Sequence, residues 1–463
     1  MWGKIIAGVI RLVMSFPRDE NSQTIERKCI EFEDFFRFTL TLRSFDKQYS
    51  CIYLARLAAL KEIVIERANS KWGQVHVLQL TQLATEDMFD NRCILIGTLY
   101  KHQELKPSIL RELSEELQIA ASPPSSYYYS DKDYVYLEDE MMRVKLTGNY
   151  VNTKDLVTGL VCAVLGHAMQ NGSFWVEDYC FPGCCPKVST SNLTTKINGK
   201  LLLVSGLDFV NYAQSMAFKL LVEYMTGTAG NRETQEEEAS IVRVIIAGNS
   251  IRSSAEIHMS KGHARNKAQD LMVANETSIA VNRFDSFLNQ IVQCCCVTLM
   301  PGQYDPTCHS MPQQPIHPCM LPKSSRYKSL HGATNPWIGR IGNRIVSGSS
   351  GQPIEDIMKV VGISKVCPLI WLERTLDWRN YAPTAPDTLP AYPYFDKDPF
   401  VMQECPDIYF VSNMEKYESK LYKGQEGQTV RLICVPEFSK THTAILVDLQ
   451  SLDTRPISFG GIS

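Results

Sequence analysis

A chain of 463 residues with 44% hydrophobic and 21% charged residues has the composition of an ordinary globular protein, and its length predicts two or three domains. Its net charge of −3 argues against autonomous binding of nucleic acid, which usually needs a clearly basic face. Fifteen cysteines, an odd number in a chain of this size, argue against a disulfide framework and for reduced intracellular thiols. No stretch is predicted to cross a membrane.

The first 44 residues are predicted to be a leader and a docking segment. Met1 to Phe16 carries two basic residues among apolar ones and is too short for a membrane span, so we expect a dispensable leader with translation beginning at Met14. The aromatic residues between Glu26 and Leu42 predict docking on the core. Cys29 to Phe36 also resembles weakly the motif that binds sliding clamps, but the glutamine of that motif is missing.

Residues 45–185 are predicted to form a helix followed by a small barrel. Apolar residues recur at helical spacing from Tyr49 to Asn69. The period then changes, and a compact run of antiparallel strands follows, which favours an OB-fold. Four or five strands are expected within Cys93 to Leu99, Tyr134 to Leu146, Leu156 to Leu165 and Gly172 to Tyr179, with a short helix or excursion at Lys106 to Gln118.

The barrel leaves two functions open. Tyr127-Tyr128-Tyr129 would suit the stacking of bases in a single-stranded DNA-binding OB protein. The acidic residues that follow, such as Glu138, Asp139 and Glu140, favour a protein-binding or structural barrel instead. A linker is expected at Phe181 to Asn198. Cys180, Cys184 and Cys185 lack the second pair of ligands that a tetrahedral zinc site needs.

Residues 186–463 are predicted to form an α/β domain. Buried strands are expected at Lys200 to Ser205, Ile241 to Ala247 and Cys294 to Met300. Helices are expected at Asp208 to Tyr224 and Lys267 to Gln293, and an acidic loop at Glu233 to Glu238. A hairpin (Ile338 to Val346), a helix (Ile354 to Val361) and three strands (Ile408 to Ser412, Thr429 to Val435, Ala444 to Leu449) then complete a two-sheet sandwich.

This order of elements is similar to that of calcineurin-like dimetal phosphoesterases, which carry metal ligands at successive strand ends. Their Asp-x-His is Ser205-Gly206-Leu207 here, and their Gly-Asp-x-x-Asp is Gly248-Asn249-Ser250-Ile251-Arg252. Their Gly-Asn-His-Asp is Gly302-Gln303-Tyr304-Asp305, and their Gly-His-x-His is replaced by Ser412-Asn413-Met414-Glu415. The remaining histidine is expected near Arg379-Asn380-Tyr381, where there is none. Metal ions of this class need carboxylate and imidazole ligands, so the sequence predicts an inactivated site.

The alternative is an active metallophosphoesterase with relocated ligands. His317 with Asp305 would be one such pair, and His309, His258 and His263 lie near the second and third strand ends. We expect these histidines to be ordinary loop residues. We therefore predict no catalytic, metal-binding or cofactor-binding residues and no cofactor.

Together the barrel and the inactivated phosphoesterase sandwich resemble the B-subunits of replicative DNA polymerases, over roughly residues 45–460. The match is closest to the delta branch, in Met300-Pro301-Gly302, Asp305-Pro306-Thr307, Pro312-Gln313-Gln314-Pro315-Ile316-His317-Pro318, Ser347-Gly348-Ser349-Ser350-Gly351-Gln352 and Pro383-Thr384-Ala385-Pro386-Asp387. Asn380, where the family often has histidine, the Cys294 to Cys296 run and the leader depart from it.

The resemblance implies a non-catalytic scaffold in the nucleus that serves DNA replication and repair. Its expected partners are the cysteine-rich C-terminal domain of the polymerase delta catalytic subunit, which docks on residues 186–463, and the third subunit, which binds on the barrel side. DNA is expected to bind only weakly or through the complex. Tyr304 and Leu207 are expected to fill the former metal pocket. Arg379 to Tyr394 is expected either to anchor an interface or to close that pocket as a rigid loop.

Overall fold

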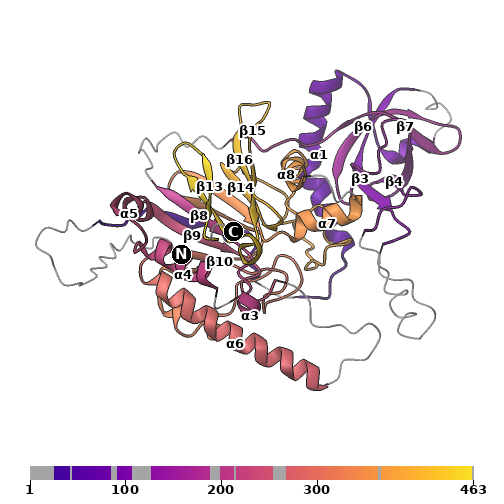
Figure 1. Cartoon of the computed structure of the whole chain (residues 1–463). Helices are drawn as coiled ribbons and strands as arrows, with labels where there is room; N and C mark the ends of the chain where they lie inside the picture. The colour runs from indigo at the N-terminus through magenta and orange to yellow at the C-terminus, as the bar shows by residue number, and fades with distance from the viewer. Residues whose placement is uncertain are drawn as a thin grey trace, which may run out of the picture.

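A computed structural model describes residues 25–41, 44–84, 91–106, 127–187, 199–212, 215–253, 267–362 and 367–460. A β-barrel lies beside a larger α/β part, and the two are joined by a shared hydrophobic core (Figure 1). Within the described ranges, no helix is long and apolar enough to cross a membrane. The predicted leader, the excursion after Lys106 and most of the predicted linker fall outside these ranges.

The barrel is a closed sheet with the strand order β2-β3-β4-β5-β7-β6, and β3 also pairs with β6. Its strands are β2 (Val77–Leu78), β3 (Cys93–His102), β4 (Tyr134–Glu138), β5 (Arg143–Thr147), β6 (Val161–Ala168) and β7 (Ser173–Cys180). The stretch from Tyr134 to Leu146 contains two strands, which gives the upper of the two strand numbers expected for the four ranges. Asp139 accepts hydrogen bonds from the Met141 and Met142 amides, and this turn divides the stretch into β4 and β5.

Helix α1 (Ser50–Trp72) covers one side of the barrel, as its periodicity predicted, and it ends at Gly73, where φ is +76°. Leu57, Leu60, Val64 and Ala68 form its buried stripe, which packs on the outer faces of β3 and β6. Arg56 is also fully buried on this helix.

The α/β part contains two six-stranded sheets, which we call the first and the second sheet. The first sheet has the order β1-β12-β13-β14-β16-β15, and the second has the order β11-β10-β9-β8-β17-β18. The first sheet comprises β1 (Phe32–Asp34), β12 (Trp337–Ile341), β13 (Arg344–Ser349), β14 (Ile408–Met414), β15 (Glu418–Lys423) and β16 (Thr429–Pro436). The second comprises β8 (Lys200–Val204), β9 (Ile241–Ala247), β10 (Val297–Met300), β11 (Leu330–Gly332), β17 (Thr443–Asp448) and β18 (Thr454–Ser458).

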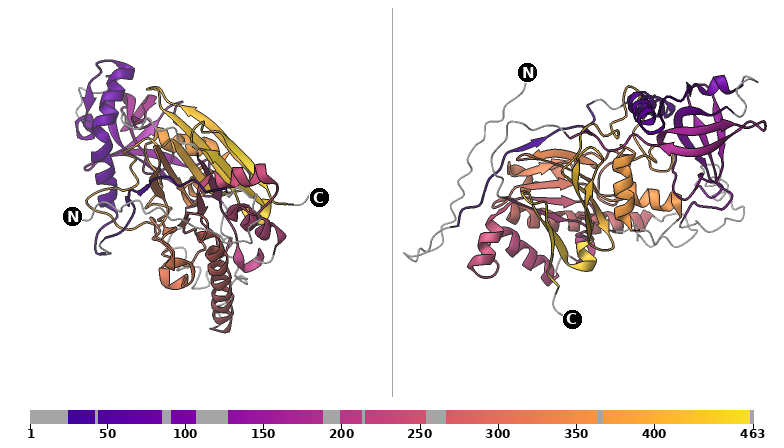
Figure 2. Two further views of the ribbon diagram at one scale, coloured as in Figure 1. Left: turned by 90° about the vertical axis from the view of Figure 1, so that its left-hand side faces the viewer. Right: turned by 90° about the horizontal axis from the view of Figure 1, so that it is seen from above.

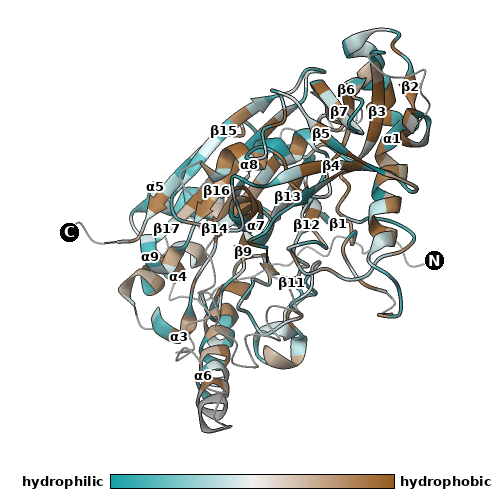
Figure 3. Cartoon of the chain, turned by 90° about the vertical axis from the view of Figure 1, so that its right-hand side faces the viewer, coloured by the Kyte–Doolittle hydropathy of each residue, from teal (hydrophilic) through white to brown (hydrophobic). Residues whose placement is uncertain are grey.

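Both sheets are covered by helices on their outer faces. Leu201, Ile245, Trp337, Phe410 and Ile433 belong to the core between the sheets. Helices α4 (Met216–Thr226) and α6 (Lys267–Val292) cover the second sheet, and α6 alternates hydrophobic and hydrophilic residues (Figure 3). Helices α7 (Gln352–Val361) and α8 (Pro368–Asp377) lie between the first sheet and the barrel.

Two expectations for this part are wrong. Glu233 to Glu238 is not a loop but most of helix α5 (Arg232–Ala239), because the Asn231 side chain caps it by accepting from Thr234 N–H and its glutamates favour a helix. The third buried strand begins at Val297 rather than Cys294. The Cys294 and Cys295 amides instead donate to the Ile291 carbonyl and close a turn after α6.

The segment before the barrel docks on the α/β part, as its aromatic residues predicted. Strand β1 pairs antiparallel with β12, and the segment runs along the α/β part before the chain enters α1 (Figure 2). Phe32 lies under the Arg243 guanidinium at 3.5 Å, and Asp34 accepts hydrogen bonds from the Trp337 indole and the His331 ring. This docking uses the residues that resembled a clamp-binding motif.

Candidate functional site

The carboxyl ends of the parallel strands meet at one edge of the second sheet, where the sequence placed the former ligand positions. The Gly206 amide donates to the Gly248 carbonyl (3.0 Å), and the Gly248 amide donates to the Met300 carbonyl (3.1 Å). The residues that follow β8, β9 and β10 are therefore neighbours, as expected from their positions in a parallel sheet.

Asp305, the carboxylate predicted at the third strand end, is engaged by the backbone. It is 5% exposed, and its oxygens accept hydrogen bonds from the Gly302 (2.8 Å), Ser250 (3.2 Å) and Ile251 (2.8 Å) amides. Burial raises its pKa to about 6, although the backbone N–H groups act in the opposite direction. Asp305 thus ties the loop after β10 to the loop after β9.

Asn249 stands where the dimetal enzymes have a bridging aspartate. It adopts a positive φ of +51°, and its side-chain oxygen lies 3.4 Å from the Tyr304 amide. Gly302 approaches it so closely that a Cβ at that position would lie 2.2 Å from the Asn249 nitrogen. Glycine is therefore required at this contact.

Three buried amide side chains connect the two sheets beside this edge. Gln313 donates from Nε2 to the Gly302 carbonyl (3.0 Å) and the Cys308 carbonyl (3.1 Å). Its Oε1 accepts from Asn335 Nδ2 (2.8 Å) and Gln352 Nε2 (2.9 Å). We call Gln313, Asn335 and Gln352 the amide cluster. Sequence reasoning missed it because its members lie in two separate loops and at the start of α7.

The end of β14 completes the connection. Asn413 donates from Nδ2 to the Ala247 (3.2 Å) and Ser350 (2.8 Å) carbonyls, and its amide donates to the Ser205 hydroxyl (3.1 Å). The Ser412 hydroxyl lies within hydrogen-bonding distance of the Ala247 carbonyl. Neutral amides and hydroxyls therefore link the strand ends of the first sheet to those of the second.

Tyr304 and Leu207, expected to fill the former pocket, lie in different environments. Leu207 is fully buried in the core beneath α4 and α6. Tyr304 is half-buried, and burial together with the nearby charges of Glu355 and Glu437 raises its pKa. The charge of Glu437 is compensated locally by Lys440, at 2.8 Å.

Comparisons with known proteins agree with this architecture. The chain is 40% identical over 425 residues to "DNA polymerase delta subunit 2" of Drosophila melanogaster. The aligned region covers 91% of this chain and 95% of the fly protein. The chain belongs to the family of DNA polymerase delta small subunits. The relatives called "DNA polymerase delta small subunit" are 36% identical over 416 residues in Arabidopsis thaliana and 30% identical over 463 residues in Saccharomyces cerevisiae. These matches cover 89% and 91% of this chain, and 91% of each relative.

Two family models divide the chain in the same way as the fold. The model described as "DNA polymerase delta subunit OB-fold domain" matches residues 48–179, which include α1 and the barrel. The model for the B-subunits of DNA polymerases alpha and epsilon matches residues 201–420, within the α/β part. The predicted OB-fold and the predicted family are confirmed.

The three cysteines considered for zinc do not converge on one site. Cys180 packs under α1, whereas the Cys185 thiol accepts from Arg379 Nε at 3.0 Å. Cys184 Sγ lies 3.6 Å from Cys405 Sγ, a neighbour that no sequence spacing indicated. Burial raises the pKa of Cys185 to about 11, so it is held as a thiol. In the part of the chain that the structure describes, no three histidine, cysteine or acidic residues gather as metal ligands.

Of the four histidines considered as relocated ligands, the structure describes His309 and His317. His317 is exposed and caps a short 3-10 helix, its Nδ1 accepting from the Cys319 amide at 3.2 Å. His309 is exposed on the loop after β10. His258 and His263 lie outside the described residues. Asp305, the proposed partner of His317, is engaged by three backbone amides instead.

The segment from Arg379 to Tyr394 is mostly buried and lies between the barrel and the α/β part. Arg56 of α1 donates to the carbonyls of Pro383 (2.8 Å) and Ala385 (2.8 Å), and its Nε pairs with Asp398 at 2.6 Å. The segment also pairs with the loop after β10, because Met311 N–H donates to the Pro390 carbonyl. An exposed anchoring role is wrong for most of this segment, since Tyr381 and Ala385 are fully buried.

Of the three tyrosines proposed to stack bases, Tyr127 is exposed, and Tyr128 and Tyr129 contact helix α7. The Tyr128 amide donates to the Lys359 carbonyl of α7, and Tyr129 packs against Gly362. Tyr128 and Tyr129 therefore help to join the barrel to α7.

Proposed function

We propose that this chain is a non-catalytic accessory subunit of nuclear DNA polymerase delta. In this role it bridges the C-terminal domain of the catalytic subunit and the third subunit during DNA replication and repair. Membership of the delta small-subunit family, over nine-tenths of the chain, carries this proposal. The proposed division is a leader and docking segment (1–44), a helical segment with the OB-fold (45–185) and an inactive phosphoesterase-like domain (186–463).

The strand ends support the non-catalytic part of the proposal. A dimetal phosphoesterase needs carboxylates and imidazoles that converge on an open edge. Here Asp305 accepts from three backbone amides, and Asn413 donates to backbone carbonyls. Gln313 also donates to backbone carbonyls, and the members of the amide cluster bond to one another. These polar groups are used to hold the two sheets together. We therefore propose that the chain has no catalytic, metal or cofactor residues.

The division into two parts supports the scaffold role. A protein with two rigidly joined parts can carry two partners on separate surfaces. The buried contacts of Arg56 with Gly159, Pro383 and Asp398 provide such a junction. We propose that the catalytic subunit docks on the α/β part and the third subunit on the barrel side.

Affinity purification of the tagged chain from nuclear extract, followed by quantitative mass spectrometry, tests the assignment. We expect the delta catalytic subunit and the third subunit in equal amounts. Recovery of the alpha or epsilon catalytic subunit instead would refute the delta assignment.

Elemental analysis of the folded chain and a phosphodiester assay with added manganese test the loss of chemistry. We expect no stoichiometric dimetal centre and no turnover. Two metal ions per chain together with turnover would establish the alternative, an active phosphoesterase with relocated ligands.

A further inference from the structure

Two cysteines that are distant in the sequence meet where the chain leaves the barrel. Cys184 follows β7, and Cys405 precedes β14 in the α/β part. Their Sγ atoms are 3.6 Å apart, although 221 positions separate the two residues. The S–S bond of a disulfide is about 2.0 Å long, so the sulfurs need to approach by about 1.5 Å to form one. Rotation about the Cα–Cβ bonds moves sulfur atoms over distances of this size.

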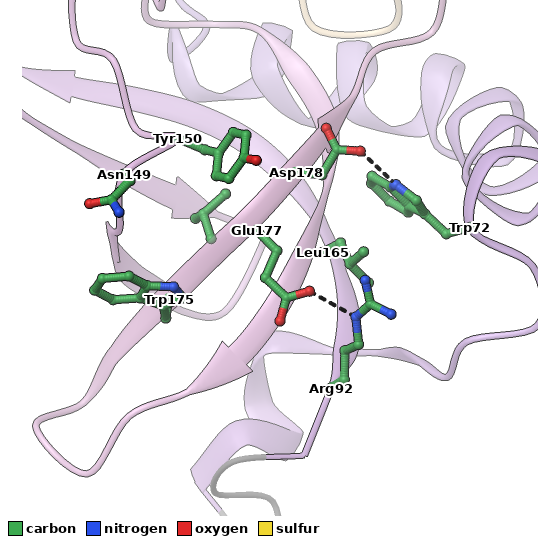
Figure 4. Close-up of a pocket in the computed structure, with 9 residues that line it drawn as sticks. Trp72, Arg92, Asn149, Tyr150, Leu165, Trp175, Glu177 and Asp178 are labelled. Carbon is green, nitrogen blue, oxygen red and sulfur yellow. Dashed lines mark hydrogen bonds and ion pairs between the residues drawn. The ribbon is translucent and has the colours of Figure 1, made fainter.

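The segment that carries Cys184 is held on both sides of the junction. On the barrel side, Asp178 of β7 accepts a hydrogen bond from the Trp72 indole of α1 (2.8 Å), beside a pocket of about 400 Å³ (Figure 4). On the other side, the Gly183 amide donates to the carbonyl of Asp377 at the end of α8 (2.7 Å). These bonds hold Cys184 against the α/β part.

The loop that carries Cys405 is held by the first sheet. The Asp407 amide donates to the Ile345 carbonyl of β13 (2.8 Å), and the Arg431 amide of β16 donates to the Asp407 carbonyl (2.8 Å). Because backbone hydrogen bonds fix both segments, the two sulfur atoms are held near each other.

Two cations lie beside the pair. The Arg379 guanidinium is 7% exposed, donates from Nε to the Cys185 sulfur (3.0 Å) and pairs with no carboxylate among the described residues. The hydrogen bond from Cys184 lowers the pKa of the Cys405 thiol, although burial acts in the opposite direction. The charges of Lys187 and Arg379 also lower this pKa. Cationic surroundings of this kind are typical of cysteines that react as thiolates.

The pair lies just below the surface of the protein. Cys184 is 8% exposed and Cys405 is 3% exposed. Pro186, two residues after Cys184, and Gln403, two residues before Cys405, are both exposed. A small uncharged oxidant therefore has a short path to the sulfur atoms.

We propose that Cys184 and Cys405 are a site of reversible oxidation, at which hydrogen peroxide converts the two thiols into a disulfide. The Cys405 thiolate attacks one peroxide oxygen and the O–O bond breaks. Cys405 becomes a sulfenic acid, and the hydroxide that leaves takes up the proton that Cys405 had released. The Cys184 sulfur then attacks the Cys405 sulfur, the S–O bond breaks, and the hydroxyl group leaves as water with the Cys184 proton. Two thiols and one peroxide thus give one disulfide and two water molecules.

The disulfide joins the segment after the barrel covalently to the loop before β14. A cross-link that closes a long loop restricts the unfolded chain strongly, so oxidation is expected to stabilise the junction between the barrel and the α/β part. Thiol reductants reverse the bond by exchange. This site goes beyond the proposed scaffold role and does not depend on the assignment to polymerase delta.

Peptide mapping of the full chain tests the site. The reduced chain is treated with hydrogen peroxide at low protein concentration, its remaining thiols are alkylated, and it is digested with trypsin without reductant. We expect the peptide 398–416, whose one cysteine is Cys405, to be linked to the peptide 155–187, which contains Cys184. Dithiothreitol should separate the two peptides. Absence of the linked peptide, under conditions that oxidise the exposed Cys308, would overturn the proposal.

Serine variants assign the link to individual sulfur atoms. Cys184→Ser and Cys405→Ser should each lower the yield of linked peptide about tenfold or more, because each removes one sulfur of the pair. Cys185→Ser is the matched control and should leave the yield unchanged. It alters a neighbouring buried thiol on the same peptide, and its hydroxyl can still accept from Arg379 and donate to the Met402 carbonyl. A link that survives Cys184→Ser, or that is lost in Cys185→Ser alone, would overturn the proposal.

Urea unfolding of the oxidised and the reduced chain measures the consequence for the junction. The oxidised chain should unfold at a higher urea midpoint than the reduced chain, and this shift should be absent in Cys184→Ser. Equal midpoints in the presence of the linked peptide would overturn the stabilising role of the disulfide.

Discussion

Arg56 and Asp398 form an ion pair of 2.6 Å in which both side chains are completely buried, although 342 positions separate them in the chain. Arg56 belongs to helix α1 beside the barrel, and Asp398 belongs to the long loop that precedes β14. The remaining guanidinium nitrogens donate to the carbonyls of Gly159, Pro383 and Ala385. One arginine therefore connects the helix, the barrel and the α/β part.

We expect Arg56→Met to destabilise the chain by about 3–5 kcal/mol, because it leaves the Asp398 carboxylate buried without a partner. Arg56→Met combined with Asp398→Leu should recover part of this loss. Arg232→Ala, which alters an exposed pair with Glu236, should cost less than about 1 kcal/mol. Denaturant unfolding measures all three. Equal effects of the buried and the exposed substitution would contradict the role of Arg56.

We expect Gln313→Leu to destabilise the chain by about 3 kcal/mol. The change removes the partners of the Gly302 and Cys308 carbonyls and leaves the Asn335 and Gln352 amides without their acceptor in a buried site. Gln425→Leu, at an exposed amide that accepts from Arg67, is the control and should have little effect. A stable Gln313→Leu variant would show that the amide cluster does not hold the sheets together.

We expect Glu238→Gln to remove the loss of folding stability that the unaltered chain suffers when Glu238 ionises at higher pH. Glu238 is fully buried on α5, and burial raises its pKa from about 4.5 to about 7. The charge of Glu237 also raises this pKa, whereas the charge of Arg27 lowers it. Because the folded state holds the proton more tightly than the unfolded state, ionisation costs stability as the pH rises from about 4.5 through 7. The variant should therefore exceed the unaltered chain in stability at pH 8, and this advantage should vanish near pH 4.5. Unfolding free energies across this range, with Glu236→Gln on the exposed face as control, measure the difference.

We expect Phe32→Ala to loosen the first strand of the first sheet. The ring lies 3.5 Å from the buried Arg243 guanidinium and stacks beside Trp337, and its loss should cost about 2 kcal/mol. Hydrogen exchange should show faster exchange at residues 32–34 and at their partners in β12. Phe36→Ala, at a ring that is 63% exposed, should leave this exchange unchanged.

The sequence predicted helix α1, the barrel and the parallel strands because apolar periodicity is local information. It also predicted which residues follow each strand, and so which metal ligands of the dimetal phosphoesterases are replaced by other residue types in this chain. The partners of those residues could not be predicted, since Gln313, Asn335 and Gln352 belong to two loops and the start of α7, which meet only in the fold. Arg56 did leave a signal: it lies four residues after Ile52 and four before Leu60, on the buried stripe of α1.

Strand β1 has a consequence for how the protein is made. Its partner β12 lies about 300 residues later in the chain, and β14 to β16 later still. At the usual rate of about 5–20 residues per second, the ribosome needs about 15–60 s to supply that partner. Phe32 and its neighbours therefore emerge long before the edge on which they pack, and any product that ends before β12 leaves them exposed to chaperones and proteases.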